Sequence, residues 1–372
     1  MGIPIAEPQS GIPTLGSPSS SGMGHLEAAP PRPALNRAQT EQALHGLNAK
    51  GFPLGLCNAL RGSLEAFPLR IWVVDNSGSM ASADGARFVN KRKIRATRWA
   101  ELGDTVIEMG ELSTLLGVRT DFHFLNPPAG GSQYVSVGPD SAENLIPTAT
   151  QVDLNGLRAL MGKSPSGGTP LDATVNNICR ALEPVAEKLL ARGQKVVVVI
   201  ATDGMPNSSP RFLEAMQRLQ RLPVWVVCRL CTSEDSIVDY YSNLDKNLEA
   251  PLEVLDDICG EAAEIKKVNP FIAYGPQLQQ LREWGLPEKL FDLLDEAPMI
   301  PSQAKAFIEF VLGCKPLPEP EVDPAAFLAA VNDALRSAPT TFDPLKLREV
   351  PWVDVGALQR QIRGGGGGCS VM

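Results

Sequence analysis

The chain has 372 residues, of which 44% are hydrophobic and 20% are charged, as in a soluble globular protein of one or two domains. Its net charge of −8 argues against a general nucleic-acid binder. No apolar run reaches the ~18 residues that a membrane span needs, and the seven cysteines do not suggest a disulfide framework. No charged segment followed by an apolar stretch opens the chain, so we expect no secretory signal and a cytoplasmic location.

The beginning of the chain is the part least suited to forming a core. Residues 1–33 are rich in Pro, Gly and Ser, cannot bury enough surface to offset their ordering entropy, and are predicted to be a disordered tail. Residues 34–66 carry apolar side chains that predict two short helices broken around Gly51-Phe52-Pro53. Gly2 invites N-myristoylation, but Ala6 stands where that motif requires Ser or Thr, so this lipid is not predicted.

Strand and helix patterns alternate from Arg70 to about Lys267. Apolar runs typical of strands cover residues 70–74, 119–125, 134–137, 195–201, 223–231 and 252–255. Helical spacings of three and four residues link Trp99, Leu102, Val106, Met109 and Ser113, then Val175, Ile178, Leu182, Val185 and Leu189, then Phe212, Met216 and Leu219. This alternation predicts an α/β fold over residues 68–267, with a doubly wound, mostly parallel sheet covered on both faces.

Two other patterns in this part of the chain have structural interpretations. The densest basic cluster, Lys91-Arg92-Lys93 with Arg95 and Arg98, is predicted to lie at the start of a helix and to form a solvated face. Cys228 and Cys231 fall in a predicted strand, where side chains three residues apart point to opposite faces. We therefore expect both cysteines to be buried in the core, and not to form a redox or metal site.

Oxygen-bearing side chains gather where predicted strands end. The run Asp75-Asn76-Ser77-Gly78-Ser79 follows one strand, and Asp203 follows another, after Thr202. Thr169 lies in the loop Ser166-Gly167-Gly168-Thr169, before a helix expected to start on Pro170. Ligands of open parallel sheets bind beyond the carboxyl ends of the strands, and hard divalent cations prefer oxygen. These residues predict a metal site, with Asx- and Ser-capped turns that hold no metal as the alternative.

Asp75, Ser77, Ser79, Thr169 and Asp203 together resemble the metal-ion-dependent adhesion site of von Willebrand factor type A domains. The family pattern is D-x-S-x-S, then a Thr in a Gly-rich loop, then an Asp at the end of a later strand. The resemblance covers roughly residues 68–267. It implies that the hydroxyls of Ser77 and Ser79 bind the cation directly and that Thr169 does so directly or through water. Asp75 and Asp203 would mostly hold ligating waters.

The resemblance also implies a cation and a partner. The cation would be Mg²⁺, with Mn²⁺ or Ca²⁺ as alternatives, and Thr202 and Asn76 would support its ligands. The partner would be a protein that presents an Asp or Glu to an open coordination position. The stretch Cys231-Thr232-Ser233-Glu234-Asp235, with Asp239-Tyr240-Tyr241, resembles cytosolic proteins of this family and differs from extracellular adhesion receptors.

The last part of the chain changes character again. Residues 269–362 have a proline-punctuated helical pattern, which predicts a small all-helical C-terminal region. Residues 363–372 form a Gly-rich tether that ends in Cys369-Ser370-Val371-Met372, which fits the C-a-a-X prenylation box with farnesyl as the lipid. Because one such lipid gives only marginal, reversible affinity for a bilayer, we expect transient contact with the cytosolic face of a membrane.

These patterns favour a metal-dependent protein-binding adaptor or scaffold. A docking subunit of a larger assembly is the first alternative, and a metal-dependent hydrolase is the second. Phosphatases with an aspartyl nucleophile place a second Asp where Ser77 stands, and none of His25, His45 and His123 is placed as an evident base. We therefore expect no enzymatic activity.

Overall fold

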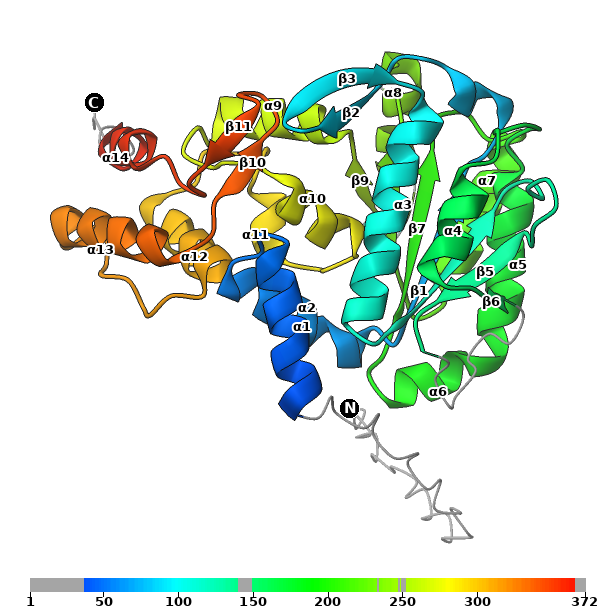
Figure 1. Cartoon of the computed structure of the whole chain (residues 1–372), viewed down its shortest axis with the longest axis horizontal. Coiled ribbons are helices and arrows are strands. Elements are labelled where there is room, and N and C mark those ends of the chain that lie inside the picture. The colour runs from blue at the N-terminus through cyan, green and yellow to red at the C-terminus, as the bar shows by residue number, and fades with distance from the viewer. Residues whose placement is uncertain (1–36, 140–148, 233, 247, 249–251, 365–372) are drawn as a thin grey trace, which may run out of the picture. The chain divides into compact units, whose positions relative to one another are not determined.

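A central β-sheet organises the chain, and the computed structural model describes residues 37–139, 149–232, 234–246, 248 and 252–364 (Figure 1). The predictions made for residues 1–33 and for Cys369 lie outside these residues. The sheet has seven strands in the order β6-β5-β4-β1-β7-β8-β9. Its strands are β1 (Leu69–Val74), β4 (Arg119–Phe124), β5 (Tyr134–Val137), β6 (Thr150–Gln151), β7 (Val196–Thr202), β8 (Val224–Leu230) and β9 (Glu253–Leu255).

The pairing of these strands confirms the predicted doubly wound, mostly parallel sheet. Strands β4, β1, β7, β8 and β9 run parallel to their neighbours, whereas β5 pairs with β4 in the antiparallel sense and β6 runs parallel to β5. From β1 the chain continues to β4 on one side of the sheet. After β7 it continues to β8 and β9 on the other side. The strand order therefore reverses between β1 and β7, which is where open α/β sheets bind their ligands.

Alternating side chains of the central strands pack on the two faces of the sheet. In β1, Ile71 and Val73 contribute to one hydrophobic cluster, and Trp72 and Val74 to the other. The helices α5 (Leu171–Leu182), α7 (Ser209–Gln220) and α8 (Asp235–Lys246) cover the first face (Figure 1). The helices α3 (Arg98–Leu115) and α4 (Leu154–Met161) cover the second (Figure 1).

The second face also packs against helices from both ends of the described chain. Its hydrophobic cluster includes side chains of α1 (Arg37–Ala49), α2 (Leu54–Ala66), α9 (Ile258–Val268), α10 (Pro276–Glu283), α11 (Lys289–Asp292), α12 (Pro301–Leu312), α13 (Pro324–Ser337) and α14 (Val355–Gly364). Arg70 of β1 is fully buried at this junction. Its Nε donates to the carbonyl of Trp284 over 3.1 Å, and its guanidinium carbon lies 3.8 Å from the centre of the Trp284 ring.

The helical C-terminal region is confirmed, and it also holds an antiparallel ribbon that was not predicted. This ribbon consists of β10 (Thr341–Asp343) and β11 (Arg348–Val350). The stripe from Val175 to Leu189 forms three elements, α5, the 3-10 turn η2 (Glu183–Val185) and α6 (Ala186–Ala191). Pro184 falls in η2, where it interrupts the helix because it lacks a backbone N–H.

The basic cluster is exposed from Lys91 to Arg95, as predicted, but of its members only Arg98 lies in a helix. Arg92 and Arg95 lie in β3 (Arg92–Ala96), which pairs with β2 (Gly85–Val89) around a turn in which Asn90 and Lys91 have φ of 49° and 63°. Because residues 92–95 are all exposed, no alternation of buried and polar side chains marks this strand in the sequence. Helix α3 begins at Arg98, whose side chain is buried and does not belong to a solvated face.

Two further predictions concern burial and membrane crossing. Cys228 and Cys231 are both buried and contribute to the clusters on opposite faces of the sheet, as predicted. None of the helices in the described part of the chain combines the length and the apolar character that crossing a bilayer needs.

Candidate metal centre at the carboxyl ends of β1 and β7

The pairing of β1 with β7 places two carboxylates side by side. Val74 is paired with Ala201, and the backbone N–H of Asp75 extends this pairing by donating to the carbonyl of Ala201 over 2.9 Å. Asp203 follows the end of β7, so both carboxylates lie at the edge of the sheet where the strand order reverses. Both are buried, with 0% and 2% of Asp75 and Asp203 exposed.

A chain of hydrogen bonds joins four of the five predicted site residues. Asp75 Oδ1 accepts from the backbone N–H of Ser77 over 2.8 Å. The Oγ atoms of Ser77 and Ser79 are 2.9 Å apart, and Ser79 Oγ donates to Asp203 Oδ1 over 2.8 Å. Ser79 lies in the 3-10 turn η1 (Gly78–Ala81) and is exposed, so the chain leads from buried carboxylates to the protein surface.

The fifth residue, Thr169, lies in a loop that contacts the turn after Asp75. The carbonyl of Gly167 accepts from the backbone N–H of Gly78 over 3.1 Å. Gly167 has φ of 94°, and a Cβ on it would collide with the side chain of Asn126, so this close approach requires glycine. Helix α5 begins at Leu171, one residue later than expected. The hydroxyl of Thr169 makes no hydrogen bond to any described residue.

Thr202 and Asn76, the predicted supporting residues, hold different parts of the centre. Thr202 Oγ1 donates to Asp75 Oδ2 over 2.6 Å, which fixes the carboxylate in place. Asn76 instead binds the backbone of Asn126, accepting from its N–H and donating to its carbonyl, each over 2.8 Å. Asn126 in turn donates from its side chain to the carbonyl of Gly168 over 2.8 Å.

Sequence reasoning missed Asn126 as the residue that ties the Asp75 loop to the Thr169 loop. The signal that could have found it is its position, since it follows the end of β4, the strand that neighbours β1. Asn207 holds Thr169 from the other side. Its Oδ1 accepts from the Thr169 N–H and its own N–H donates to the Thr169 carbonyl, both over 3.1 Å.

Sequence reasoning also missed Arg98, which brings a positive charge to the centre. Its Nη1 donates to Asp203 Oδ2 over 3.0 Å. Its Nε and Nη2 donate to the two carboxylate oxygens of Asp84 over 2.8 and 2.6 Å, and Nη2 also donates to Glu234 over 2.9 Å. Arg98 therefore joins the loop before β2, the loop after β7 and the segment before α8.

The titration of these groups follows from burial and from Arg98. Burial raises the pKa of Asp75, and the hydrogen bonds from Thr202 and Ser77 oppose that rise. The nearby charge of Asp203 raises the pKa of Asp75 further. The hydrogen bonds between Arg98 and Asp84 lower the pKa of Asp84 and raise that of Arg98. A buried pair of carboxylates of this kind is stabilised by any cation that comes close to it.

The oxygen atoms of this centre suit a small divalent cation. In an octahedral Mg²⁺ site with metal–oxygen distances of about 2.0–2.1 Å, neighbouring ligand atoms are about 2.9 Å apart. The Ser77–Ser79 and Ser79–Asp203 oxygen separations are 2.9 and 2.8 Å. The centre differs from sites built on three or more His, Cys, Asp or Glu side chains, of which the described residues form none. Hydroxyls and carboxylates are the hard donors that Mg²⁺ prefers.

Comparison with known proteins gives structural likenesses but no match in sequence. No protein-family profile matches the chain, and no curated protein sequence matches it. The crystal structure of the manganese-loaded TRAP protein of Plasmodium vivax is similar with a TM-score of 0.33 and 14% sequence identity, covering 51% of this chain and 69% of that chain.

Proposed function

We propose that the chain is a metal-dependent protein-binding adaptor or scaffold. A divalent cation, Mg²⁺ by preference and Mn²⁺ or Ca²⁺ as alternatives, would be held at Asp75, Ser77, Ser79, Thr169 and Asp203. The observation that carries this proposal is the hydrogen-bonded chain from Asp75 to Asp203 through the two serine hydroxyls, at the point where the strand order reverses.

The cation would supply a positive centre to which a carboxylate of a partner protein binds. Ser77 and Ser79 would hold it through their hydroxyls, and the free hydroxyl of Thr169 would complete the set. Asp75 and Asp203 offset its two positive charges, which leaves room for one more anionic ligand. Because Ser79 is exposed while both carboxylates are buried, a partner would approach from the side of Ser79.

A hydrolase has less support. His123 is the histidine that folding could have brought close to Ser77 or Ser79, and it lies within β4 with 5% of its surface exposed. Burial lowers its pKa to about 4. A histidine with so low a pKa is a weak base at neutral pH, so it is poorly matched to taking a proton from water. We therefore propose binding, with docking into a larger assembly as a use of the same centre.

Calorimetric titration of the full chain with Mg²⁺ tests the centre. We expect binding by the wild-type chain and none by the double variant Asp75→Ala/Ser77→Ala. Ser82→Ala is the matched control, because Ser82 is exposed close to the site and its side chain makes no hydrogen bond to a described residue. Circular dichroism checks that each variant is folded. Unchanged Mg²⁺ affinity in the double variant would refute the centre.

Capture of partners from a lysate tests the binding function. Proteins retained by the wild-type chain in Mg²⁺ should be released by EDTA and absent with Asp75→Ala/Ser77→Ala. Partners that remain bound in both cases contradict a metal-dependent contact.

We further propose that Cys369 is farnesylated and brings this adaptor transiently to the cytosolic face of a membrane.

A further inference from the structure

A second site is suggested by a pocket of about 490 Å³ in the C-terminal region. The pocket lies between the β10–β11 ribbon, α13 and the segment that leads into α14. Its apolar lining includes Phe271, Ile272, Val350 and Val353, which are all buried. A volume of this size falls within the range of roughly 300–1,000 Å³ that is typical of small-molecule sites.

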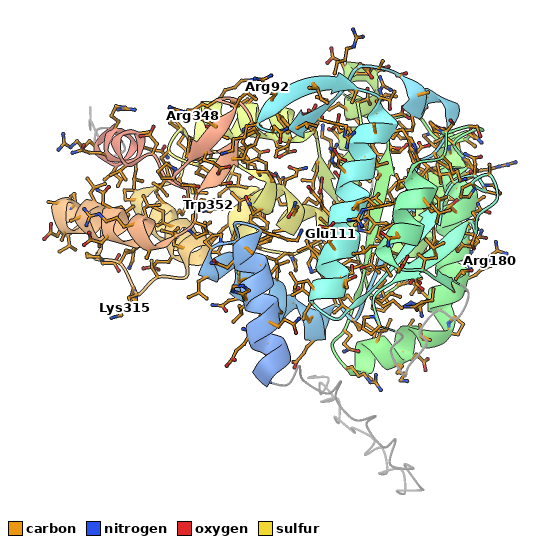
Figure 2. The ribbon with its side chains drawn as sticks, in the orientation of Figure 1. Arg92, Glu111, Arg180, Lys315, Arg348 and Trp352 are labelled. Atoms are coloured by element: carbon orange, nitrogen blue, oxygen red, sulfur yellow. The ribbon has the colours of Figure 1, made fainter. Side chains whose placement is uncertain are left out.

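Four basic side chains also line this pocket, in a chain whose net charge is −8. They are Lys266 of α9, Arg336 of α13, Lys346 of the ribbon turn and Arg348 of β11, and Figure 2 shows Arg348 on its strand. Three of them are exposed and Lys266 is half-buried, whereas the apolar residues beneath them are buried. The pocket therefore combines an apolar floor with a basic rim.

Two of these cations have no carboxylate partner among the residues that the structure describes. Arg336 pairs with Asp333 at 2.8 Å, and Lys346 pairs with Asp343 at 3.2 Å. Lys266 donates only to the carbonyl of Pro270, over 2.8 Å. The side chain of Arg348, a residue of the ribbon, makes no hydrogen bond or ion pair within that part of the chain. The rim thus has two cations whose charge is available to a ligand.

The single carboxylate in the lining does not cancel this charge. Asp354 accepts from the backbone N–H of Ala357 over 2.9 Å, at the first turn of α14. A carboxylate in that position interacts favourably with the N-terminal end of the helix, whose partial positive charge offsets part of the negative charge of Asp354. The pocket remains positive next to an apolar floor.

We propose that this pocket binds a single-chain anionic amphiphile, such as a fatty acid, taken up from solution as a monomer. The hydrocarbon chain would lie against the accessible apolar side chains of Leu335, Pro351 and Val355, above the buried floor. The anionic end would reach the rim and pair with Arg348 and Lys266. An acidic peptide would use the rim but leave the apolar floor uncovered, so charge and shape together favour the amphiphile. This proposal does not depend on the metal centre or on prenylation.

Calorimetry of the full chain with decanoate, below its micelle concentration and at pH 8, tests the proposal. Decanol has the same hydrocarbon chain as decanoate without the charge, and acetate has the carboxylate without the long hydrocarbon chain. We expect decanoate to bind at least about tenfold more tightly than either, because only decanoate uses both the floor and the rim. Equal affinity for decanoate and decanol, or no binding of decanoate, would overturn the proposal.

Variants locate the binding. Arg348→Gln/Lys266→Gln should weaken decanoate binding by roughly tenfold or more, since each lost charge-assisted hydrogen bond weakens binding. Arg92→Gln/Lys315→Gln removes the same charge from exposed residues that do not line the pocket (Figure 2) and should leave the affinity unchanged. The single variant Arg348→Gln, at an exposed position, should give a smaller loss in the same direction. Equal effects of the two double variants would overturn the proposal.

Two further arms separate other occupants. A poly-glutamate peptide that binds with the same dependence on Arg348, while decanoate does not bind, would assign the pocket to an acidic protein segment and overturn the proposal. Vesicles of anionic phospholipid that recruit the chain through Arg348, with no binding of monomeric decanoate, would assign the rim to a membrane surface and also overturn it. Binding of monomeric decanoate, with no competition from the poly-glutamate peptide or from the vesicles, supports the proposal.

Discussion

Arg98 and Asp203 form a buried ion pair, with Nη1 of the guanidinium 3.0 Å from Oδ2 of the carboxylate. The other oxygen of Asp203 accepts from Ser79. The carboxylate that we propose as part of a metal centre is therefore bound on one side by a cation of the protein itself. Arg98 should stabilise the centre when no metal is present and oppose the charge of an incoming metal.

Removing Arg98 tests this double role. In metal-free buffer, Arg98→Gln leaves Asp203 buried without its cation, a change that costs about 3–5 kcal/mol at comparable sites. We expect a lower melting temperature without Mg²⁺, a larger stabilisation by Mg²⁺ than in the wild type, and Mg²⁺ affinity raised on the order of tenfold by calorimetry. Arg92→Gln, at an exposed residue of β3, is the control. Mg²⁺ affinity that stays equal or falls would contradict the opposing role of Arg98.

His123 should make the protein sensitive to acid. Neither of its ring nitrogens has a hydrogen-bond partner among the described residues, and burial, aided by the charge of Arg119, lowers its pKa from 6.5 to about 4. The unfolded chain binds a proton below about pH 6.5, where the folded chain does not. His123 therefore contributes stability above pH 6.5, and this is lost as the pH falls toward 4, by about 3 kcal/mol in total.

Urea unfolding of His123→Phe across this pH range measures the effect. Phenylalanine keeps a ring against Tyr134, whose ring centre lies 4.7 Å from that of His123. The free energy of unfolding of the variant should fall less than that of the wild type between pH 6.5 and 4. His45→Gln, at an exposed histidine, should follow the wild type. Parallel pH profiles for the wild type and His123→Phe would show that this histidine is not the acid-sensitive group.

The segment 68–267 should not fold when it is separated from the rest of the chain. Arg70 donates to the carbonyl of Trp284 and to Ser63 Oγ, over 3.1 and 3.3 Å, and both partners lie outside the segment. Excision would leave a buried cation without these acceptors and would open the hydrophobic cluster on the Trp72 face. We expect cooperative urea unfolding for residues 37–364 and none for 68–267. A sharp transition in the shorter segment would disprove this dependence.

The lipid proposal has its own test in a eukaryotic host. Cys369→Ser should move the chain from the membrane fraction to the soluble fraction, because it removes the thiol that prenylation requires. Cys314→Ser changes a half-buried cysteine elsewhere and should leave the distribution as in the wild type. A wild-type chain that is wholly soluble in that host would count against prenylation.

Much of the sheet could be predicted because burial leaves a clear pattern in its strands. All seven residues of β7 are buried, and its unbroken apolar run reflects this directly. The ribbon β2–β3 left no such pattern, because its side chains are half-buried or exposed and its turn residues, Asn90 and Lys91, include no glycine to mark the positive φ angles. An exposed strand is identified by the strand with which it pairs, and the local residue pattern of β2 and β3 does not specify that pairing.

The candidate site likewise has residues that could be predicted from the sequence and one, Arg98, that could not. Asp75, Ser77 and Ser79 are close in sequence, and strand ends bring Asp203 beside them, so spacing and strand pattern were enough. Arg98 was assigned to a solvent-exposed face because its neighbours in sequence are basic, yet its partner Asp203 is 105 residues away. A contact of that kind depends on the angle at which α3 leaves the ribbon, which local residue patterns do not specify.

The packing of α2 against α12 can form only after α12 has been synthesised, long after α2. A Cβ on Gly55 would collide with the carbonyl of Phe310, so the two backbones lie in close contact. Helix α12 begins roughly 235 residues after α2 ends. At about 5–20 residues per second, the apolar side of α2 waits on the order of ten to fifty seconds for its partner to be made. During that interval α2 lacks the helix that covers its apolar side, so we expect chaperones at the ribosome to bind the nascent chain.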